Sequence, residues 1–222
     1  GGGIQCGWTA ALKKSYAPEI NSVGWYTGGT PSNLTALVEK INGGPFAGYI
    51  AGGLGGVIST YPDVKKYTDK VFTKQAQKDL DFPKKHCQGD ITSHFHFKNF
   101  YDKSFSTVGK RFLYEPVIQN TLNELTMGVN PEFTPDTPVL MVHGISDEVA
   151  PYEAAHTTYK SWCKNGADVE FVNFANPVSA HGVTTVTSSV PGFLWIRDRL
   201  QGKPVQSGCR ESKNYDVGIN SH

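Results

Sequence analysis

The sequence has little cysteine and no surplus of charge of either sign. Its four cysteines lie far apart in 222 residues and form no Cys-x-x-Cys pair, which argues against a zinc site or a thioredoxin-type redox pair. Lys and Arg number 21 against 20 Asp and Glu, so no field of one sign is available to hold nucleic acid. We expect no nucleic-acid partner and interpret the cysteines as disulfide formers.

Long apolar runs are also missing. No stretch approaches the roughly 18 consecutive apolar residues that a membrane span needs, and the glycine-rich start is unlike a signal peptide. A hydrophobic content of 38% nevertheless allows a sizeable core. We expect a soluble globular protein whose secretion signal lies outside these residues.

Predicted helices and strands alternate along the chain. Helices are expected over residues 4–14, 151–166 and 183–200, the last one broken by Pro191, and strands over 23–26, 139–143 and 169–174. This alternation is typical of an α/β protein with a parallel sheet. Residues from 33 to about 125 are predicted to form short helices, and the polar residues 210–222 a mobile tail.

Two residues follow predicted strands directly, where the reactive groups of parallel sheets gather. Asp147 comes after strand 139–143 and His181 after strand 169–174, each just ahead of a helix. An acid followed by a histidine is the chain order of α/β-hydrolases, in which the acid orients a histidine that acts as base. The simpler alternatives are that Asp147 only caps the next helix and that His181 is an ordinary loop residue.

The sequence lacks the Gly-x-Ser-x-Gly pentad that carries the nucleophile of such enzymes. Ser146 follows Gly144 at the right offset, but Asp147 and Glu148 come next and no strand-to-helix turn is predicted there. We therefore reject Ser146 as nucleophile. The opening residues 1–8 have the small side chains expected immediately after such a pentad's serine.

Several segments together resemble the fungal secretory lipase family over most of the chain. They are Gly1-Gly2 with Trp8, Ser15-Tyr16-Ala17-Pro18-Glu19, Gly28-Gly29-Thr30-Pro31, Asn42-Gly43-Gly44-Pro45-Phe46-Ala47-Gly48, Asp147-Glu148 with Pro151-Tyr152, and His181. The resemblance implies an α/β-hydrolase fold with residues 1–32 and 131–222 in the hydrolase core and 33–130 in an inserted helical cap or lid. Within that insertion, the glycine-rich run 46–58 is expected either to line an acyl tunnel or to hold packing glycines between close helices.

The resemblance also implies a secreted, serine-dependent lipase or carboxylesterase that needs no cofactor and contacts a lipid interface. Asp147 and His181 match the triad positions, the serine would directly precede Gly1, and the Gly1 N–H would be an oxyanion donor. We expect the chain alone to be inactive without an N-terminal part of the same lipase. The start of the chain directly after the expected serine is explained either by cleavage of the polypeptide at that position or by a serine that carries a covalent modification.

The cysteines fit the same family pattern. By resemblance, Cys163 and Cys209 form a disulfide, Cys87 bridges to the N-terminal part, and Cys6 is an unpaired, buried helix cysteine.

Asn33 begins a glycosylation sequon, and the alternating His94 and His96 are not assigned to a metal. Two other functions stay open, namely a non-catalytic lipid-binding remnant and an acyltransferase that uses the same triad.

Overall fold

The computed structural model describes residues 1–175 and 179–213 and divides into two compact units. The first unit contains residues 1–33 and the described residues from Thr126 onward. The second unit is Leu34–Leu125. Each unit is described by itself.

The first unit is built on a four-stranded sheet in the order β1-β2-β3-β4. The strands are β1 (Trp25–Gly28), β2 (Val139–Gly144), β3 (Val169–Phe174) and β4 (Arg210–Lys213), and neighbouring strands are parallel. Every residue of β2 and β3 is buried. Burial on both faces explains why apolar residues occupy neighbouring positions in these strands instead of strictly alternating with polar ones, although His143 of β2 and Glu170 and Asn173 of β3 are buried polar residues.

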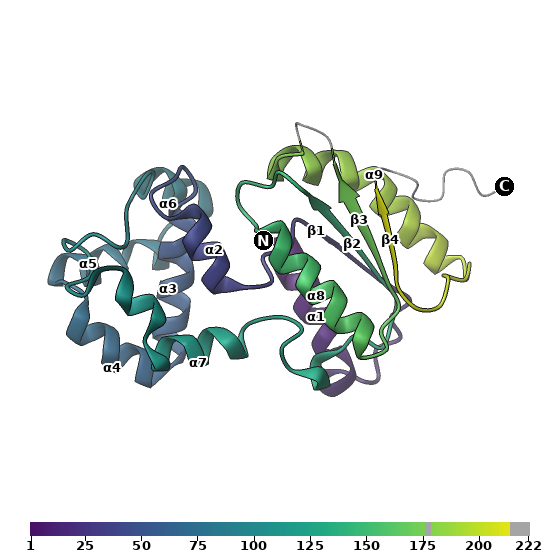
Figure 1. Ribbon diagram of the computed structural model, residues 1–222, viewed down its shortest axis with the longest axis horizontal. Coiled ribbons are helices and arrows are strands. Elements are labelled where there is room, and N and C mark those ends of the chain that lie inside the picture. The colour runs from purple at the N-terminus through teal and green to yellow at the C-terminus, as the bar shows by residue number, and fades with distance from the viewer. Residues whose placement is uncertain (176–178, 214–222) are drawn as a thin grey trace. The chain divides into compact units, whose positions relative to one another are not determined.

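Helices cover both faces of this sheet (Figure 1). On one face, α1 (Gly2–Tyr16) and α8 (Tyr152–Lys164) share a core with Met141 and Phe171, to which they contribute Ala10 and Trp162. On the other face, α9 (His181–Leu200) places Trp195 against Leu140 and Val172. The predicted α/β layering is confirmed.

The last helix differs from its prediction, because α9 starts at His181 and continues through Pro191 without a break. Proline removes one N–H from a helix, and its ring crowds the preceding turn. The turn before Pro191 carries side-chain hydrogen bonds, such as the Thr187 hydroxyl donating to the Val183 carbonyl at 2.8 Å. Pro191 is also buried, and the next residue, Gly192, lies directly against the Tyr26 ring. Packing on the sheet therefore holds the helix together across the proline.

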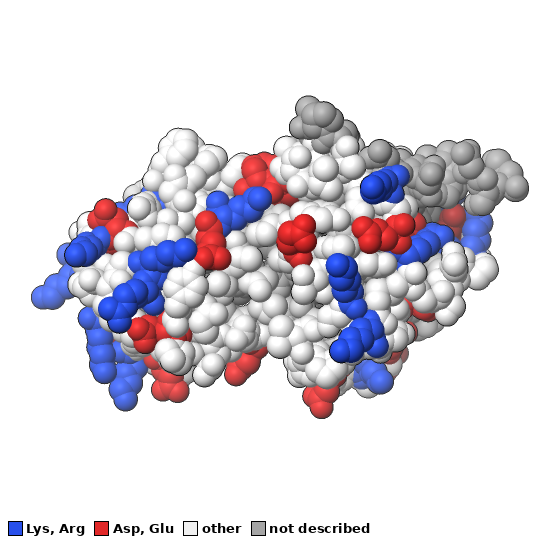
Figure 2. Space-filling model, viewed as in Figure 1, with Lys and Arg blue, Asp and Glu red and all other residues white. Residues whose placement is uncertain are grey.

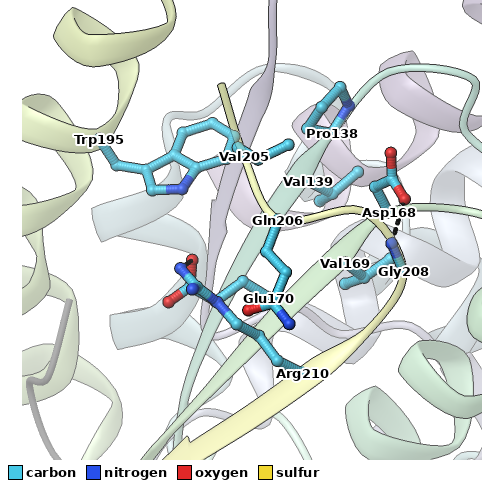
Figure 3. Close-up of a pocket in the computed structure, with 10 residues that line it drawn as sticks. All are labelled: Pro138, Val139, Asp168, Val169, Glu170, Trp195, Val205, Gln206, Gly208 and Arg210. Atoms are coloured by element: carbon cyan, nitrogen blue, oxygen red, sulfur yellow. Dashed lines mark hydrogen bonds and ion pairs between the residues drawn. The ribbon is translucent and has the colours of Figure 1, made fainter. Parts of the chain in front are cut away.

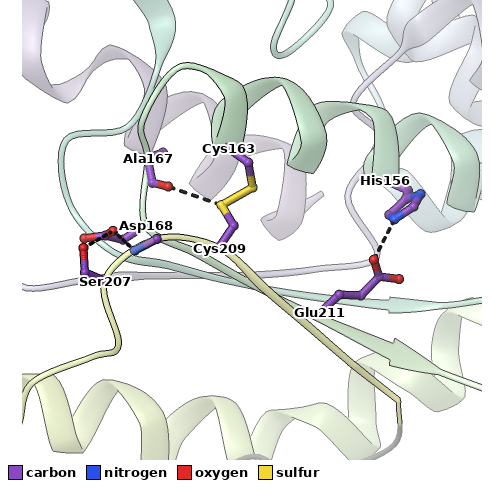
Figure 4. The surroundings of a disulfide bond; sticks show 8 residues. His156, Cys163, Ala167, Asp168, Ser207, Cys209 and Glu211 are labelled. Atoms are coloured by element: carbon purple, nitrogen blue, oxygen red, sulfur yellow. Dashed lines mark hydrogen bonds and ion pairs between the residues drawn. A yellow bond between two sulfur atoms is a disulfide. The ribbon is translucent and has the colours of Figure 1, made fainter.

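The expected mobile tail is wrong for its first residues. Arg210–Lys213 forms β4, which pairs with β3 and places Arg210 in an ion pair with Glu170. The expected disulfide is confirmed, since Cys163 at the end of α8 is bonded to Cys209 just before β4, with Cα atoms 5.8 Å apart (Figure 4). The disulfide bond and the parallel pairing with β3 together order this segment. Residues 214–222 lie outside the described residues.

The second unit is helical. Its helices are α2 (Leu34–Ile41), α3 (Gly48–Thr60), α4 (Pro62–Val71), α5 (Lys74–Asp79), α6 (Gln88–His94) and α7 (Pro116–Glu124), with 3₁₀ turns at Phe82–Lys84 and Gly109–Tyr114. Buried phenylalanines dominate its core, among them Phe72, Phe95, Phe100, Phe105 and Phe112. Among the described residues of the whole chain, no helix is both long enough and apolar enough to cross a membrane.

Charged side chains of both signs are interspersed on the surface. On the face shown in Figure 2, Lys and Arg alternate with Asp and Glu instead of gathering into a field of one sign.

Candidate active site

The ends of three adjacent parallel strands meet at one edge of the sheet. Gly29 directly follows β1, Asp147 lies three residues past β2, and His181 follows β3 as the first residue of α9. Carboxyl ends of parallel strands share an edge, so side chains on these loops come together. The structure thus brings Asp147 and His181 into direct contact, with Oδ2 of Asp147 2.8 Å from Nδ1 of His181.

Asp147 is almost fully buried, with 1% of its surface exposed. Its Oδ1 atom accepts the main-chain N–H groups of Val149 at 2.9 Å and Ala150 at 2.7 Å. Burial alone raises the pKa of this carboxyl, but the hydrogen bond from His181 and the electrostatic interactions with His181 and His143 outweigh burial, and the net pKa is lowered. Asp147 is therefore ionised near neutral pH, and both of its carboxylate oxygens accept hydrogen bonds.

An ionised carboxylate can only accept a hydrogen bond, which decides the tautomer of His181. Nδ1 of His181 carries the proton that points at Asp147, and Nε2 of the neutral ring keeps a lone pair. About 24% of the His181 side chain is exposed, so the ring is accessible from solvent. The pair is arranged to take a proton at Nε2 and to stabilise the imidazolium that results.

A second histidine contacts this pair and was missed from the sequence. His143, on β2, is 1% exposed, and its Nε2 atom lies 3.0 Å from the carbonyl oxygen of Ala150. A carbonyl only accepts, so Nε2 of His143 is protonated; it also lies 3.5 Å from Oδ2 of Asp147. His143 thus holds the loop that carries Asp147. Its signal in the sequence was a polar residue in an otherwise apolar strand.

Two glycines leave room for the pair, and sequence reasoning gave neither a role in the site. A Cβ atom on Gly29, whose φ is +53°, would lie 2.9 Å from the His181 ring. A Cβ atom on Gly144 would lie 2.1 Å from the carbonyl oxygen of Ser179, which precedes the histidine loop. A glycine at the end of β2 and another directly after β1 were the available signal, because close approach of loops requires them.

The chain's opening is pressed against the same edge, as its small residues predicted. A Cβ atom on Gly3 would lie 2.5 Å from the carbonyl oxygen of Gly28 at the end of β1. Gly1 is exposed and directly precedes α1. Its role as oxyanion donor stays a prediction. Ser146 is exposed, and its N–H points to the Ser179 hydroxyl at 3.4 Å.

The other histidines do not form a metal site in the described part of the chain. His94 stacks on Phe82 with ring centroids 4.0 Å apart, and His96 lies against Phe97. Within residues 1–175 and 179–213, no three His, Cys, Asp or Glu side chains gather as metal ligands.

A small hollow lies at the opposite end of the sheet. Val139 and Val169, the first residues of β2 and β3, line it together with Trp195 and Arg210 (Figure 3). Reactive groups of parallel sheets gather at the carboxyl ends of strands. The hollow is therefore separate from the site of Asp147 and His181.

The second unit contains an apolar cavity of its own. Apolar and aromatic side chains of α2, α3, α4, α7 and the 3₁₀ turn Gly109–Tyr114 line it, and its empty space of roughly 580 Å³ includes open solvent. Its lining includes Leu37, Ile50, Leu54, Phe112 and Leu122.

The glycines of α3 differ in their surroundings. A Cβ atom on Gly48 would lie 2.6 Å from the carbonyl oxygen of Ile91, so Gly48 lets α3 approach α6. Gly53 lines the cavity, and a Cβ atom there would meet nothing within 4 Å. Packing and cavity lining are both present in the same helix.

A family model described as secretory lipase matches residues 1–208. The chain belongs to the secretory lipase family. It is 89% identical over 222 residues to a secreted triacylglycerol lipase of Malassezia globosa, covering all of this chain and 49% of that relative. A secreted triacylglycerol lipase of Malassezia furfur is 42% identical over 209 residues, which are 94% of this chain and 43% of that relative.

Among solved structures, Candida antarctica lipase A in its closed state matches with a TM-score of 0.81 and 27% identity, over 92% of this chain and 48% of that one. Together with the helix-covered parallel sheet, this likeness confirms the α/β-hydrolase fold. The chain spans about half the length of the relatives it matches. Close relatives are named as secreted, in agreement with the expected extracellular location.

Proposed function

We propose that this chain carries the acid and the base of a Ser-Asp-His triad in a secreted lipase that hydrolyses triacylglycerols and other acyl esters. The observation that carries this proposal is the 2.8 Å contact between Asp147 Oδ2 and His181 Nδ1, made at the strand edge where hydrolase chemistry gathers. The family and the names of its members support an ester substrate. The nucleophile is proposed to be a serine directly before Gly1.

Each group has one task in this scheme. Nε2 of His181 removes the serine proton while the serine oxygen bonds to the ester carbonyl carbon. The imidazolium then gives that proton to the leaving alcohol, and Asp147 stabilises the positive ring. The N–H group of Gly1 is proposed to donate to the oxyanion. Water, activated by the same His181, then releases the fatty acid and restores the serine.

The apolar cavity of the second unit is proposed as the acyl-chain site. Its lining offers almost no polar group, which suits a hydrocarbon chain. We infer that Leu34–Leu125, the unit that contains it, is the cap of the enzyme.

The proposal includes a disulfide bond from Cys87 to the remainder of the lipase and glycosylation at Asn33. Cys87 is exposed and free in this structure, as a cysteine would be whose partner lies in the remainder of the lipase. Cys6 is also free but half-buried rather than buried. The intact secreted protein should lose a disulfide-linked piece on reduction if the chain is cleaved and Cys87 bridges the pieces. Loss of glycan mass in the Asn33→Gln variant would test glycosylation at Asn33.

The decisive test uses the full-length lipase that contains these residues. Wild-type enzyme should hydrolyse a triacylglycerol emulsion and be labelled by an organophosphonate on the serine. His181→Ala should lower kcat by at least about 10⁴-fold, because a triad acts as a unit. His96→Ala, a change at an exposed histidine, should leave turnover unchanged.

Other results would point to other functions. Tight lipid binding without turnover or labelling by the wild type would favour a non-catalytic lipid-binding protein. Products formed mainly with added alcohols rather than water would favour an acyltransferase.

A further inference from the structure

Two consecutive carboxylates contact His181 at different atoms. Asp147 accepts from the imidazole ring, whereas Oε2 of Glu148 accepts the main-chain N–H of His181 at 2.9 Å. The two bonds hold the ring and the backbone of one residue from a single neighbouring loop.

The start of α9 depends on this outside acceptor. The first N–H groups of a helix have no partner inside the helix, and a side-chain oxygen at the N-terminus satisfies one of them. The N-cap residue of α9 is Ala180, which has no such oxygen, and the first turn contains no acidic residue. Glu148 supplies the missing acceptor, and its negative charge suits the positive end of the helix dipole.

The two loops also contact each other away from these bonds. Gly144 has no room for a side chain beneath Ser179, and the Ser146 N–H points to the Ser179 hydroxyl. Asp147 is buried within this contact, but Glu148 is exposed. A change at Glu148 therefore removes one hydrogen bond without opening a cavity in the core.

We propose that Glu148 is a positioning residue, which anchors the backbone of His181 so that the ring stays between Asp147 and the reacting oxygen. Asp147 restrains only one side of the imidazole, and the ring can still swing when its Cα moves. The anchor on the His181 N–H fixes the Cα and therefore the direction of Nε2. This inference rests on the proposed triad.

The kinetic test compares two variants of the full-length lipase. Glu148→Ala should lower kcat about tenfold with an unchanged KM, because a misplaced catalytic group slows chemistry without weakening substrate binding. Glu148→Gln keeps an oxygen at the same reach and should stay within about threefold of wild type. Glu153→Ala, a change at an exposed acid in the first turn of α8, is the matched control and should be unchanged.

A second readout does not depend on ester turnover. Amide hydrogen exchange at His181, measured by NMR or by mass spectrometry of a short peptide, should accelerate about tenfold in Glu148→Ala and not in Glu148→Gln. If the wild-type lipase turns over no ester, the proposed function fails while this exchange still tests the anchor. The proposed positioning role of Glu148 is overturned if Glu148→Ala matches wild type in the amide exchange rate of His181 or in kcat. It is also overturned if Glu148→Gln is as impaired as Glu148→Ala.

Discussion

Nδ1 of His181 lies 2.8 Å from Oδ2 of Asp147, although the two residues are 34 positions apart in the chain. The contact is possible because both follow neighbouring parallel strands, β2 and β3, which are in register from Val139 opposite Val169. The bond fixes the proton on Nδ1 and leaves Nε2 as the proposed base.

Asp147→Asn tests this tautomer directly. An asparagine of the same shape can present its N–H₂ group to His181, which favours the tautomer with the proton on Nε2. We expect kcat to fall by about 10⁴-fold with little change in fold. Ester hydrolysis by the full-length variant measures the loss. Turnover within tenfold of wild type would show that Asp147 only holds its own loop through the N–H groups of Val149 and Ala150.

Stability should depend on pH through the same carboxyl. The pKa of Asp147 is lowered in the folded protein, so the unfolded chain binds its proton more readily and the ionised form stabilises the fold. This contribution is complete above the ordinary aspartate pKa of about 3.9 and is lost as the pH falls through the lower, folded value. The measurement is the free energy of unfolding of wild type and Asp147→Asn, obtained with denaturant between pH 2 and 6, roughly the range around that pKa. This free energy should fall less steeply toward low pH in the variant than in the wild type. Equal slopes would contradict the prediction.

Gly29→Ala should reduce activity more than stability. The added Cβ would lie 2.9 Å from Cε1 of the His181 ring and must displace it. The positive φ also costs about 1 kcal/mol in folding free energy. Gly166→Ala is the matched control, because its φ is +89° and a Cβ there meets nothing within 4 Å. Both variants should lose similar stability, but only Gly29→Ala should lose kcat, by roughly tenfold to a hundredfold.

The disulfide between Cys163 and Cys209 should be a major stabiliser of the first unit. It closes a loop with a sequence separation of 46, worth about 4 kcal/mol in the chain-entropy model. In a chain of these 222 residues, the double variant Cys163→Ala/Cys209→Ala should melt roughly 8–16 °C below the unchanged chain. Thiol alkylation without reductant should spare these two cysteines in the wild type. Labelling of either one would refute the bond.

The glycines of α3 should respond in opposite ways to a side chain. Gly53→Leu places its side chain in the open cavity and should shift the preference of the lipase toward shorter acyl esters without loss of stability. Gly48→Ala should lower the melting temperature, because its Cβ would lie 2.6 Å from the Ile91 carbonyl oxygen. Gly52→Ala, with nothing within 4 Å, serves as control for helix propensity. An unchanged chain-length profile in Gly53→Leu would rule out the cavity as the acyl site.

The elements that follow local rules were predictable. β2 and β3 are recognisable because burial on both faces favours short runs that are mainly apolar, and α8 because Pro151 precedes it and Gly166 follows it. Asp147 and His181 stood out because each follows such a strand. Where a longer-range contact competes with a local rule, prediction failed. α9 continues across Pro191 because the sheet supports it, and Arg210–Lys213 is a strand because β3 and a disulfide hold it.

The sequence by itself determined the alternation of strands and helices, the family resemblance and the choice of Asp147 and His181 as the proposed acid–base pair. Periodicity and turn chemistry act over a few residues and are readable from the chain alone. Only the tertiary structure decided that His143 supports the loop of Asp147, that Gly29 makes room for the ring and that Glu148 binds the backbone of His181. These contacts join residues on different strands, and their distances depend on strand register and loop packing, which no local pattern encodes.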